Sequence, residues 1–147
     1  IVACDISPER LKLVQENCTR LGVTCVEAIQ NSEFKTQNSR FDRILIDAPC
    51  SNTGVLRRRV DLRWRVTPEE ILRLQKTQLD LLKSAAPALK PGGMLVYSTC
   101  SLEPEENSTV IQEFLKEQKD FKLERERELL PFTDQLDGAF VARLRKL

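Results

Sequence analysis

Short apolar runs alternate with amphipathic helical patterns along this chain, and this alternation limits the folds open to it. Ile1–Cys4 and Phe41–Asp47 read as strands, and the continuous apolar run Ile44-Leu45-Ile46 is predicted to be fully buried. Strands that alternate with helices at intervals of roughly 20–30 residues are typical of a layered α/β sheet. We therefore predict an α/β fold in which ligands bind outside the carboxyl ends of the strands.

Two helices carry clear start and stop signals. Ser7 is a predicted N-cap with Pro8 at the first helical position, and Gly22 is predicted to close this helix. Residues 67–70, "TPEE", read as the capping box of a longer helix, which residues 90–93, "KPGG", bring to an end. The predicted apolar stripe of the longer helix consists of Leu72, Leu79, Leu82, Ala86 and Leu89.

The remaining elements follow from the same patterns. A helix is predicted from Pro104, and residues 30–40 are polar and loop-like. The last two strands have no helix between them, so they are predicted to pair antiparallel. Further strands are predicted at Thr24–Ala28, Met94–Ser98, 121–127 and 138–146.

The bulk composition excludes several classes of protein. The 147 residues include 23 basic and 22 acidic ones, so the net charge of +1 gives no global field and any nucleic-acid surface must be a local patch. No run approaches about 18 apolar residues, and we expect no membrane association. The length suits a single domain, residues 1–147, and the lack of an initiator methionine before Ile1 indicates a fragment.

Five cysteines and no histidine narrow the chemistry further. The number of cysteines is odd and no C-x-x-C pair occurs, which favours a reducing, cytoplasmic compartment over a disulfide framework. The absence of histidine excludes a Cys-His dyad, a Ser-His-Asp triad and any His-ligated metal site, and we expect no metal. Cys4, Cys18 and Cys25 lie within apolar patterns and are predicted to be small core residues.

The other two cysteines each follow the end of a predicted strand, Cys50 in "ILIDAPCS" and Cys100 in "LVYSTCS". The carboxyl ends of parallel strands meet at one edge, so Asp5, Asp47 and both thiols are predicted to converge on one crevice. Position alone leaves Cys100 either a buried thiol or a nucleophile beside a helix start. Cys50 and Asp47 could equally belong to a stiff turn around Pro49, and Asp5 could be a helix-start residue or a ribose ligand.

An arginine-rich segment, "VLRRRVDLRWR", follows Cys50. Arginine forks bind phosphate, and an aromatic ring can stack on an unpaired base, so this segment is predicted to face a substrate. The alternative is a solvated loop with its tryptophan folded onto the core. The arginine loop consists of Arg57, Arg58, Arg59, Arg63, Trp64 and Arg65.

Two stretches carry a family likeness. "DAPCSNTGVLRRRVDLRW" and "GGMLVYSTCSLEPEEN", with the terminal "DGAFVARLRK", resemble the RNA cytosine-C5 methyltransferases of the Fmu/Sun family, and the likeness covers essentially the whole chain. Those enzymes use S-adenosylmethionine to make 5-methylcytosine in ribosomal RNA. The resemblance implies a Rossmann-like methyltransferase sheet with helices on both faces, S-adenosylmethionine as cofactor and ribosomal RNA as partner.

The resemblance also implies roles for particular residues. Cys100 would be the nucleophile that adds to C6 of the cytosine, and Cys50 would help to break the resulting adduct. Asp47 would lie near both the cofactor and the target base, and Asp5 would hold the cofactor ribose. Gln30 or its neighbour Asn31 occupies the position of a third, usually acidic, cofactor contact.

The sequence departs from the family pattern in the cofactor region. None of its five glycines matches the glycine-rich loop that precedes the Asp5 strand in the family, and an upstream lysine is missing. We expect these residues alone to be inactive, to bind cofactor weakly or not at all, and to have a sheet that is either interrupted or abnormally closed between the Asp5 and Asp47 strands. Two alternatives remain: a non-catalytic RNA-binding remnant that uses residues 57–65, and a nucleotide-binding domain without RNA. The five glycines are Gly22, Gly54, Gly92, Gly93 and Gly138.

Overall fold

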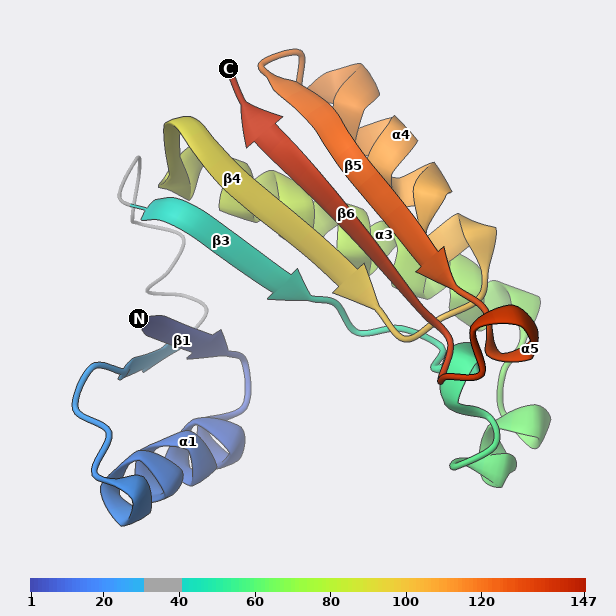
Figure 1. The fold of residues 1–147 in the computed structure, drawn as a ribbon, viewed down its shortest axis with the longest axis horizontal. Helices are drawn as coiled ribbons and strands as arrows, with labels where there is room; N and C mark the ends of the chain where they lie inside the picture. The colour runs from blue at the N-terminus through green and yellow to red at the C-terminus, as the bar shows by residue number, and fades with distance from the viewer. Residues whose placement is uncertain (31–40) are drawn as a thin grey trace. The chain divides into compact units, whose positions relative to one another are not determined.

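A computed structural model describes residues 1–30 and 41–147, which form two compact units, Ile1–Asn38 and Ser39–Leu147 (Figure 1). One sheet has the order β1-β2 and the other the order β3-β4-β6-β5, so no strand pairing joins them among the described residues. This confirms the predicted α/β class, and of the two outcomes predicted for the sheet the described residues show an interrupted ladder. The single-domain assignment stays a prediction, and the predicted loop at 30–40 lies outside the described residues beyond its first residue.

The N-terminal unit is a β-α-β element. β1 (Val2–Asp5) pairs in parallel with β2 (Glu27–Gln30), and α1 (Pro8–Leu21) packs against both. The side chain of Ser7 caps α1, and Gly22 closes it in the left-handed region at φ 67°, as predicted.

Two predictions for this unit are wrong. The predicted strand Thr24–Ala28 is displaced, because β1 begins at Val2 and its register sets Glu27 as the first partner. Burial of the three core cysteines is also wrong, since Cys4 and Cys25 are exposed and Cys18 is only partly covered. A two-stranded sheet with one helix is too small to bury them, and its described buried apolar residues are Leu11 and Ile29.

The C-terminal unit contains four strands. β3 and β4 are parallel, whereas β6 runs antiparallel to both β4 and β5, as predicted for the last strand pair. Both α3 and α4 lie on one face of this sheet, and neither covers the opposite face (Figure 1). The strands are β3 (Phe41–Asp47), β4 (Leu89–Thr99), β5 (Phe121–Leu129) and β6 (Ala139–Lys146), and the helices are α3 (Pro68–Ala85) and α4 (Ser108–Glu117).

Short helical turns connect these elements. The predicted helix from Pro104 is a 3-10 turn followed by α4, and α3 gives way to a 3-10 turn around Pro87, whose ring cannot fit inside an α-helix. None of the described helices is both long and apolar enough to cross a membrane. The turns are η1 (Thr53–Val55), η2 (Val60–Trp64), η3 (Ala86–Ala88), η4 (Pro104–Glu106) and α5 (Pro131–Asp134).

The core lies between the sheet and α3 and α4. Thr67 caps α3 by accepting from the backbone N–H of Glu70, as predicted, but the predicted apolar stripe is partly wrong. Leu82 is buried as predicted, but Leu72 is 58% exposed and the buried side of α3 includes Gln78. Gln78 lies on the inner face although it is polar, because its Nε2 donates hydrogen bonds to Pro49 and Glu106.

The predicted full burial of Ile44-Leu45-Ile46 is wrong as well. Leu45 is 70% exposed, because β3 is the edge strand of its sheet and only one sheet face is covered by helices. Ile44 and Ile46 pair with Leu95 and Tyr97 of β4, which are completely buried.

Candidate active site

Cys50 and Cys100 lie side by side at one edge of the C-terminal sheet. β3 ends at Asp47 and β4 at Thr99, and the parallel register brings both strand ends to the same edge. The Sγ atoms of the two cysteines are 3.3 Å apart. Two segments about fifty residues apart in the sequence thus deliver two thiols to one point.

The neighbouring thiols change each other's acidity. A hydrogen bond from Cys50 stabilises the ionised Sγ of Cys100 and lowers the pKa of Cys100 to about 7, although burial and the charges of Asp47 and Glu106 act in the opposite direction. The same hydrogen bond, together with burial, raises the pKa of Cys50. Cys100 is therefore the thiol that ionises first, and its activation needs no histidine.

Asn52 ties the two cysteine segments together. It stands in the left-handed region at φ 61°, which asparagine tolerates better than most residues. Its Oδ1 accepts a hydrogen bond from Cys100 Sγ at 3.0 Å, and its Nδ2 donates to the backbone oxygen of Cys50 at 2.7 Å. The contact with Cys100 exists only in the protonated thiol, so ionisation frees Sγ from Asn52.

A buried carboxylate lies beneath the thiols. Glu106 is completely buried and accepts from the N–H of Ser51 at 2.9 Å, from the hydroxyl of Ser101 at 2.6 Å and from Nε2 of Gln78 at 3.0 Å. The Ser51 hydroxyl also donates to it. Since a buried carboxylate is tolerated only when hydrogen bonds satisfy it, these donors fix Glu106, and Glu106 fixes the residue that follows each cysteine.

Two glycines let three backbone segments cross below the site. The N–H of Gly54 donates to the Cys100 carbonyl at 3.0 Å, and the N–H of Gly138 donates to the Gly54 carbonyl at 2.8 Å. A Cβ on Gly54 would lie 2.3 Å from the Gly138 oxygen, which no side chain could tolerate. The start of β6 is thereby joined to both cysteine segments.

The predicted carboxylate and amide ligands fall into two groups. Asp47 lies at the thiol edge, where the Ser98 hydroxyl donates to its Oδ1 at 3.4 Å. Asp5 and Gln30 are register partners at the carboxyl ends of β1 and β2 in the N-terminal unit. Asp5 accepts from the N–H of Ser7 at 2.8 Å and is held by Arg10 at 3.3 Å. Convergence of Asp5 with the thiols stays a prediction.

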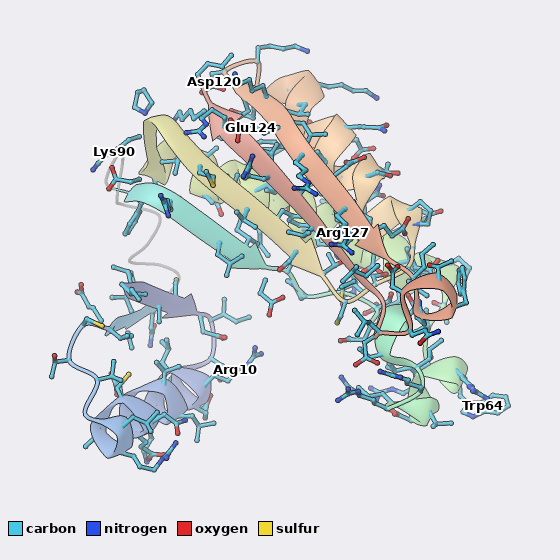
Figure 2. The ribbon with its side chains drawn as sticks, viewed as in Figure 1. Arg10, Trp64, Lys90, Asp120, Glu124 and Arg127 are labelled. Atoms are coloured by element: carbon cyan, nitrogen blue, oxygen red, sulfur yellow. The ribbon has the colours of Figure 1, made fainter. Side chains whose placement is uncertain are left out.

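The tryptophan of the arginine loop points into solvent. Trp64 is 88% exposed, and Figure 2 shows it projecting from the end of η2. The alternative in which Trp64 folds onto the core is therefore wrong. An exposed indole can stack on an unpaired base without any rearrangement of the loop.

The arginines of this loop differ in their partners. Arg57 and Arg58 share the carboxylate of Asp137, Arg58 at 2.7 Å, and Arg65 lies 3.4 Å from Asp61. Arg59 and Arg63 have no ion pair with any described residue. The paired side chains remain largely exposed, so their ion pairs are weak and a phosphate could replace the carboxylate.

Sequence reasoning missed the residues that hold the site. The sequence patterns assign no role to Glu106, Asn52 or Gln78. Their importance depends on contacts between distant segments, which no local pattern reveals. One local signal was available, namely that an asparagine two residues after Pro-Cys suits a left-handed turn.

The geometry defines a class of protein: a Rossmann-like α/β domain with two thiols and a carboxylate at the carboxyl ends of its strands. The family model described as 16S rRNA methyltransferase RsmB/F matches residues 1–145, and the chain belongs to this family. The predicted Fmu/Sun membership is thereby confirmed.

Individual relatives agree with this assignment. Ribosomal RNA small subunit methyltransferase B of Proteus mirabilis is 41% identical over 149 residues, which are 99% of this chain and 35% of the relative. The crystal structure of PH0851 superposes with a TM-score of 0.93 at 32% identity, covering 99% of this chain and 37% of that one. NSun6 from Pyrococcus horikoshii, solved with SFG, gives a TM-score of 0.87 at 33% identity, covering 99% and 41%. The chain thus spans about a third of the length of the curated relative.

Proposed function

We propose that this protein methylates C5 of a cytosine in ribosomal RNA, with S-adenosylmethionine as methyl donor and Cys100 as nucleophile. The observation that carries the proposal is the 3.3 Å separation of two strand-end thiols, one of which has its pKa lowered to about 7. Membership of the 16S rRNA methyltransferase family supports the substrate and the reaction class. A non-catalytic RNA-binding remnant would have no need for two adjoining thiols.

The chain's own residues would carry out the covalent steps. The Cys100 thiolate forms a bond from Sγ to C6 of the cytosine, and the C5–C6 π electrons move toward C5, which becomes nucleophilic. After methylation, solvent water accepts the C5 proton, the electron pair of the C5–H bond restores the double bond, and the C6–Sγ bond breaks to release Cys100 as a thiolate. Cys50 lies close enough to Cys100 to assist this release.

Asp5, Gln30 and Asp47 are proposed to hold the cofactor. S-adenosylmethionine, when bound, supplies the methyl group as an electrophile. Asp5 and Gln30 fit a nucleoside ligand because they stand next to each other at the carboxyl ends of paired parallel strands. The solved NSun6 structure contains SFG, an analogue of this cofactor, which supports the same ligand here. Asp47 would lie between the cofactor and the target base.

The arginine loop is proposed to contact the RNA. Arg59 and Arg63 are available for phosphate, Arg57, Arg58 and Arg65 can exchange their exposed carboxylate partners, and Trp64 is open to a base. The target cytosine must leave its stack to reach thiols at a sheet edge, and exposed phosphate contacts beside that edge would hold the flanking nucleotides.

An RNA that carries 5-fluorocytosine tests the proposal in the natural full-length protein. Fluorine at C5 cannot leave as a proton does, so the Cys100–C6 adduct should persist and be found by peptide mass spectrometry, only in the presence of S-adenosylmethionine. Unmodified RNA should gain 5-methylcytosine under the same conditions. RNA binding without adduct or methylation would instead identify the non-catalytic alternative.

A further inference from the structure

The sheet of the C-terminal unit has one face that α3 and α4 leave uncovered. Residues paired across neighbouring strands share a face, so the register assigns the side chains of this open face. Three rows of cross-strand partners lie on this face, each given in the strand order β5, β6, β4, β3. The first row is Lys122, Arg145, Met94 and Arg43, the second is Arg125, Arg143, Val96 and Leu45, and the third is Arg127, Val141, Ser98 and Asp47. The opposite sides of the same strands carry Leu95, Tyr97, Ala142 and Leu144, which are completely buried.

A β-bulge in β5 gathers the cations on this face. The register shifts between Leu123 and Arg125, so Glu124 is the extra residue. Strict alternation would place Lys122 on the side opposite to Arg125 and Arg127, whereas the bulge brings all three to the open face. Figure 2 shows Arg127 and Glu124 on this side of β5.

Two of the three acidic residues of β5 are directed elsewhere. Glu126 and Glu128 pair with Ala142 and Phe140, whose side chains lie on the helix side, and they line a hollow of about 320 Å³ together with Arg127 and the start of α4. The register of "KLEREREL" thus assigns its bases to one face and two of its acids to the other, and Arg127 also reaches the hollow that these acids line. The cationic sheet face consists of Arg43, Lys122, Arg125, Arg127, Arg143 and Arg145.

Three acids moderate this face without neutralising it. Glu124 lies 3.0 Å from Arg143 and 2.8 Å from Arg145, and its hydrogen bond to Arg145 holds the pKa of Glu124 below its ordinary value. Asp134 lies 3.9 Å from Arg127, and Asp47 stands at the thiol edge. Arg43, Lys122 and Arg125 have no ion pair with any residue that the structure describes.

We propose that the cationic sheet face binds the phosphodiester backbone of the RNA substrate. The proposal rests on the proposed function, and it adds a second contact surface to the arginine loop. The last row of the face places Arg127 on the same strand level as Asp47, so the face begins at the thiol edge and extends away from it along β5 and β6. An RNA strand whose target base enters the site could continue across this face.

The chemistry of the face favours phosphate. It is dominated by guanidinium groups, which bind phosphate through paired N–H donors, and the side chains of Arg127 and Arg143 are about half exposed and able to reorient. The surrounding protein has a net charge of only +1, so this local excess of cations is not a consequence of overall composition.

Salt titrations of RNA binding test the proposal in the natural full-length protein. The probe is a labelled single-stranded oligonucleotide with a ribosomal RNA sequence. The variant Lys122→Ala/Arg125→Ala/Arg127→Ala should weaken binding at least tenfold and flatten the slope of log K against log salt by about 0.7 for each phosphate that the protein no longer neutralises. The control Lys76→Ala/Lys116→Ala/Lys119→Ala removes the same charge from the exposed surface of α3, α4 and the residues just after α4 and should leave both quantities unchanged.

Glu124→Gln supplies a test in the opposite direction. It removes an acid from the face and releases Arg143 and Arg145, so RNA binding should tighten and the salt slope should steepen. Equal slopes in the two triple variants, both folded by their melting curves, would overturn the proposal. The proposal would also be overturned if the triple variant on β5 lost affinity for an oligoglutamate peptide but not for RNA. An acidic protein segment would then be the occupant of this face. Adduct formation on 5-fluorocytosine RNA at saturating concentration is measured in parallel, so a loss of chemistry is distinguished from a loss of backbone binding.

Discussion

The thiol edge and the arginine loop lie next to each other in the sequence but are built in opposite ways. Ser51, Ser101 and Glu106 are buried below the thiols and linked by short hydrogen bonds. The arginine loop contains the 3-10 turn η2, exposed ion pairs and an exposed tryptophan. A covalent step requires two sulfurs at a fixed separation, whereas a flexible polyanion can be held by side chains that adapt to it.

The largest effect should come from the thiols themselves. In the natural full-length protein, Cys100→Ser should abolish methylation, because a serine hydroxyl is not ionised near neutral pH and no histidine is present to activate it. Cys50→Ser should retain attack but fail in release, and protein should accumulate on unmodified RNA as a band that resists denaturing gels. An adduct formed by Cys100→Ser and not by Cys50→Ser would reverse the two assignments.

Removal of the arginine loop's charge should have the next largest effect, and on RNA affinity alone. The variant with Arg57, Arg58, Arg59, Arg63 and Arg65 changed to Ala should bind RNA much more weakly, with a salt slope flatter by about 0.7 for each phosphate left without its arginine. Filter binding at several salt concentrations measures both. Unchanged affinity and slope in a folded variant would remove this loop from the substrate surface.

Glu106→Ala should affect stability instead. It leaves the N–H and hydroxyl of Ser51 and the hydroxyl of Ser101 without their buried acceptor, at a cost of about 1–3 kcal/mol per unsatisfied group before any relaxation. Urea unfolding gives the change, and Glu105→Ala is the matched control because Glu105 is exposed. Equal stability of the two variants would show that the carboxylate does not hold the thiol edge together.

The pH dependence of alkylation distinguishes the two cysteines. Because the pKa of Cys100 is lowered to about 7, its thiolate is present above that pH and is lost as the pH falls below it. The rate of Cys100 alkylation by iodoacetamide, resolved by peptide mass spectrometry, should fall about tenfold per pH unit below pH 7 and level off above it. Cys50→Ala removes the thiol that stabilises this anion and should move the transition to higher pH. A transition at pH 7 on Cys50 instead would contradict the assignment.

The smallest effect expected is that of Trp64→Ala on stability. Since this side chain is 88% exposed, the free energy of unfolding should change by no more than about 0.5 kcal/mol. RNA affinity should nevertheless fall by about 1–3 kcal/mol, with little change in salt slope, if the indole stacks on a base. A loss of stability of about 3–5 kcal/mol, typical of a truncated core aromatic, would contradict the exposed position.

The sequence predicted those features that depend on neighbours in the chain. Ser7 and Thr67 cap their helices, Gly22 closes α1, and β3 has the predicted bounds, since each depends on a few adjacent residues. The strand-end cysteines could also be brought together from sequence, because parallel strands must present their carboxyl ends at one edge.

Features that depend on distant segments could not be predicted in this way. Leu45 reads as buried because an apolar run does not reveal whether its strand lies at the edge of a sheet. The burial of Glu106 is not visible in the sequence, because its hydrogen-bond donors come from Ser51, Gln78 and Ser101. The bulge at Glu124 could not be predicted from the alternation of residues along β5, although it determines the sheet face on which Lys122 lies.

The position of β6 has a consequence for synthesis on the ribosome. β6 follows β5 in the chain but lies between β4 and β5 in the sheet, so β4 lacks one partner until the residues from Ala139 onward have been made. The same late segment brings Gly138 against Gly54 below the thiols. While α4 and β5 are being translated, the unpaired edge of β4 with its apolar side chains is open to wrong pairing. Completion of the sheet and closure of the reactive edge should therefore occur together, as a single late event after nearly all of the unit has emerged.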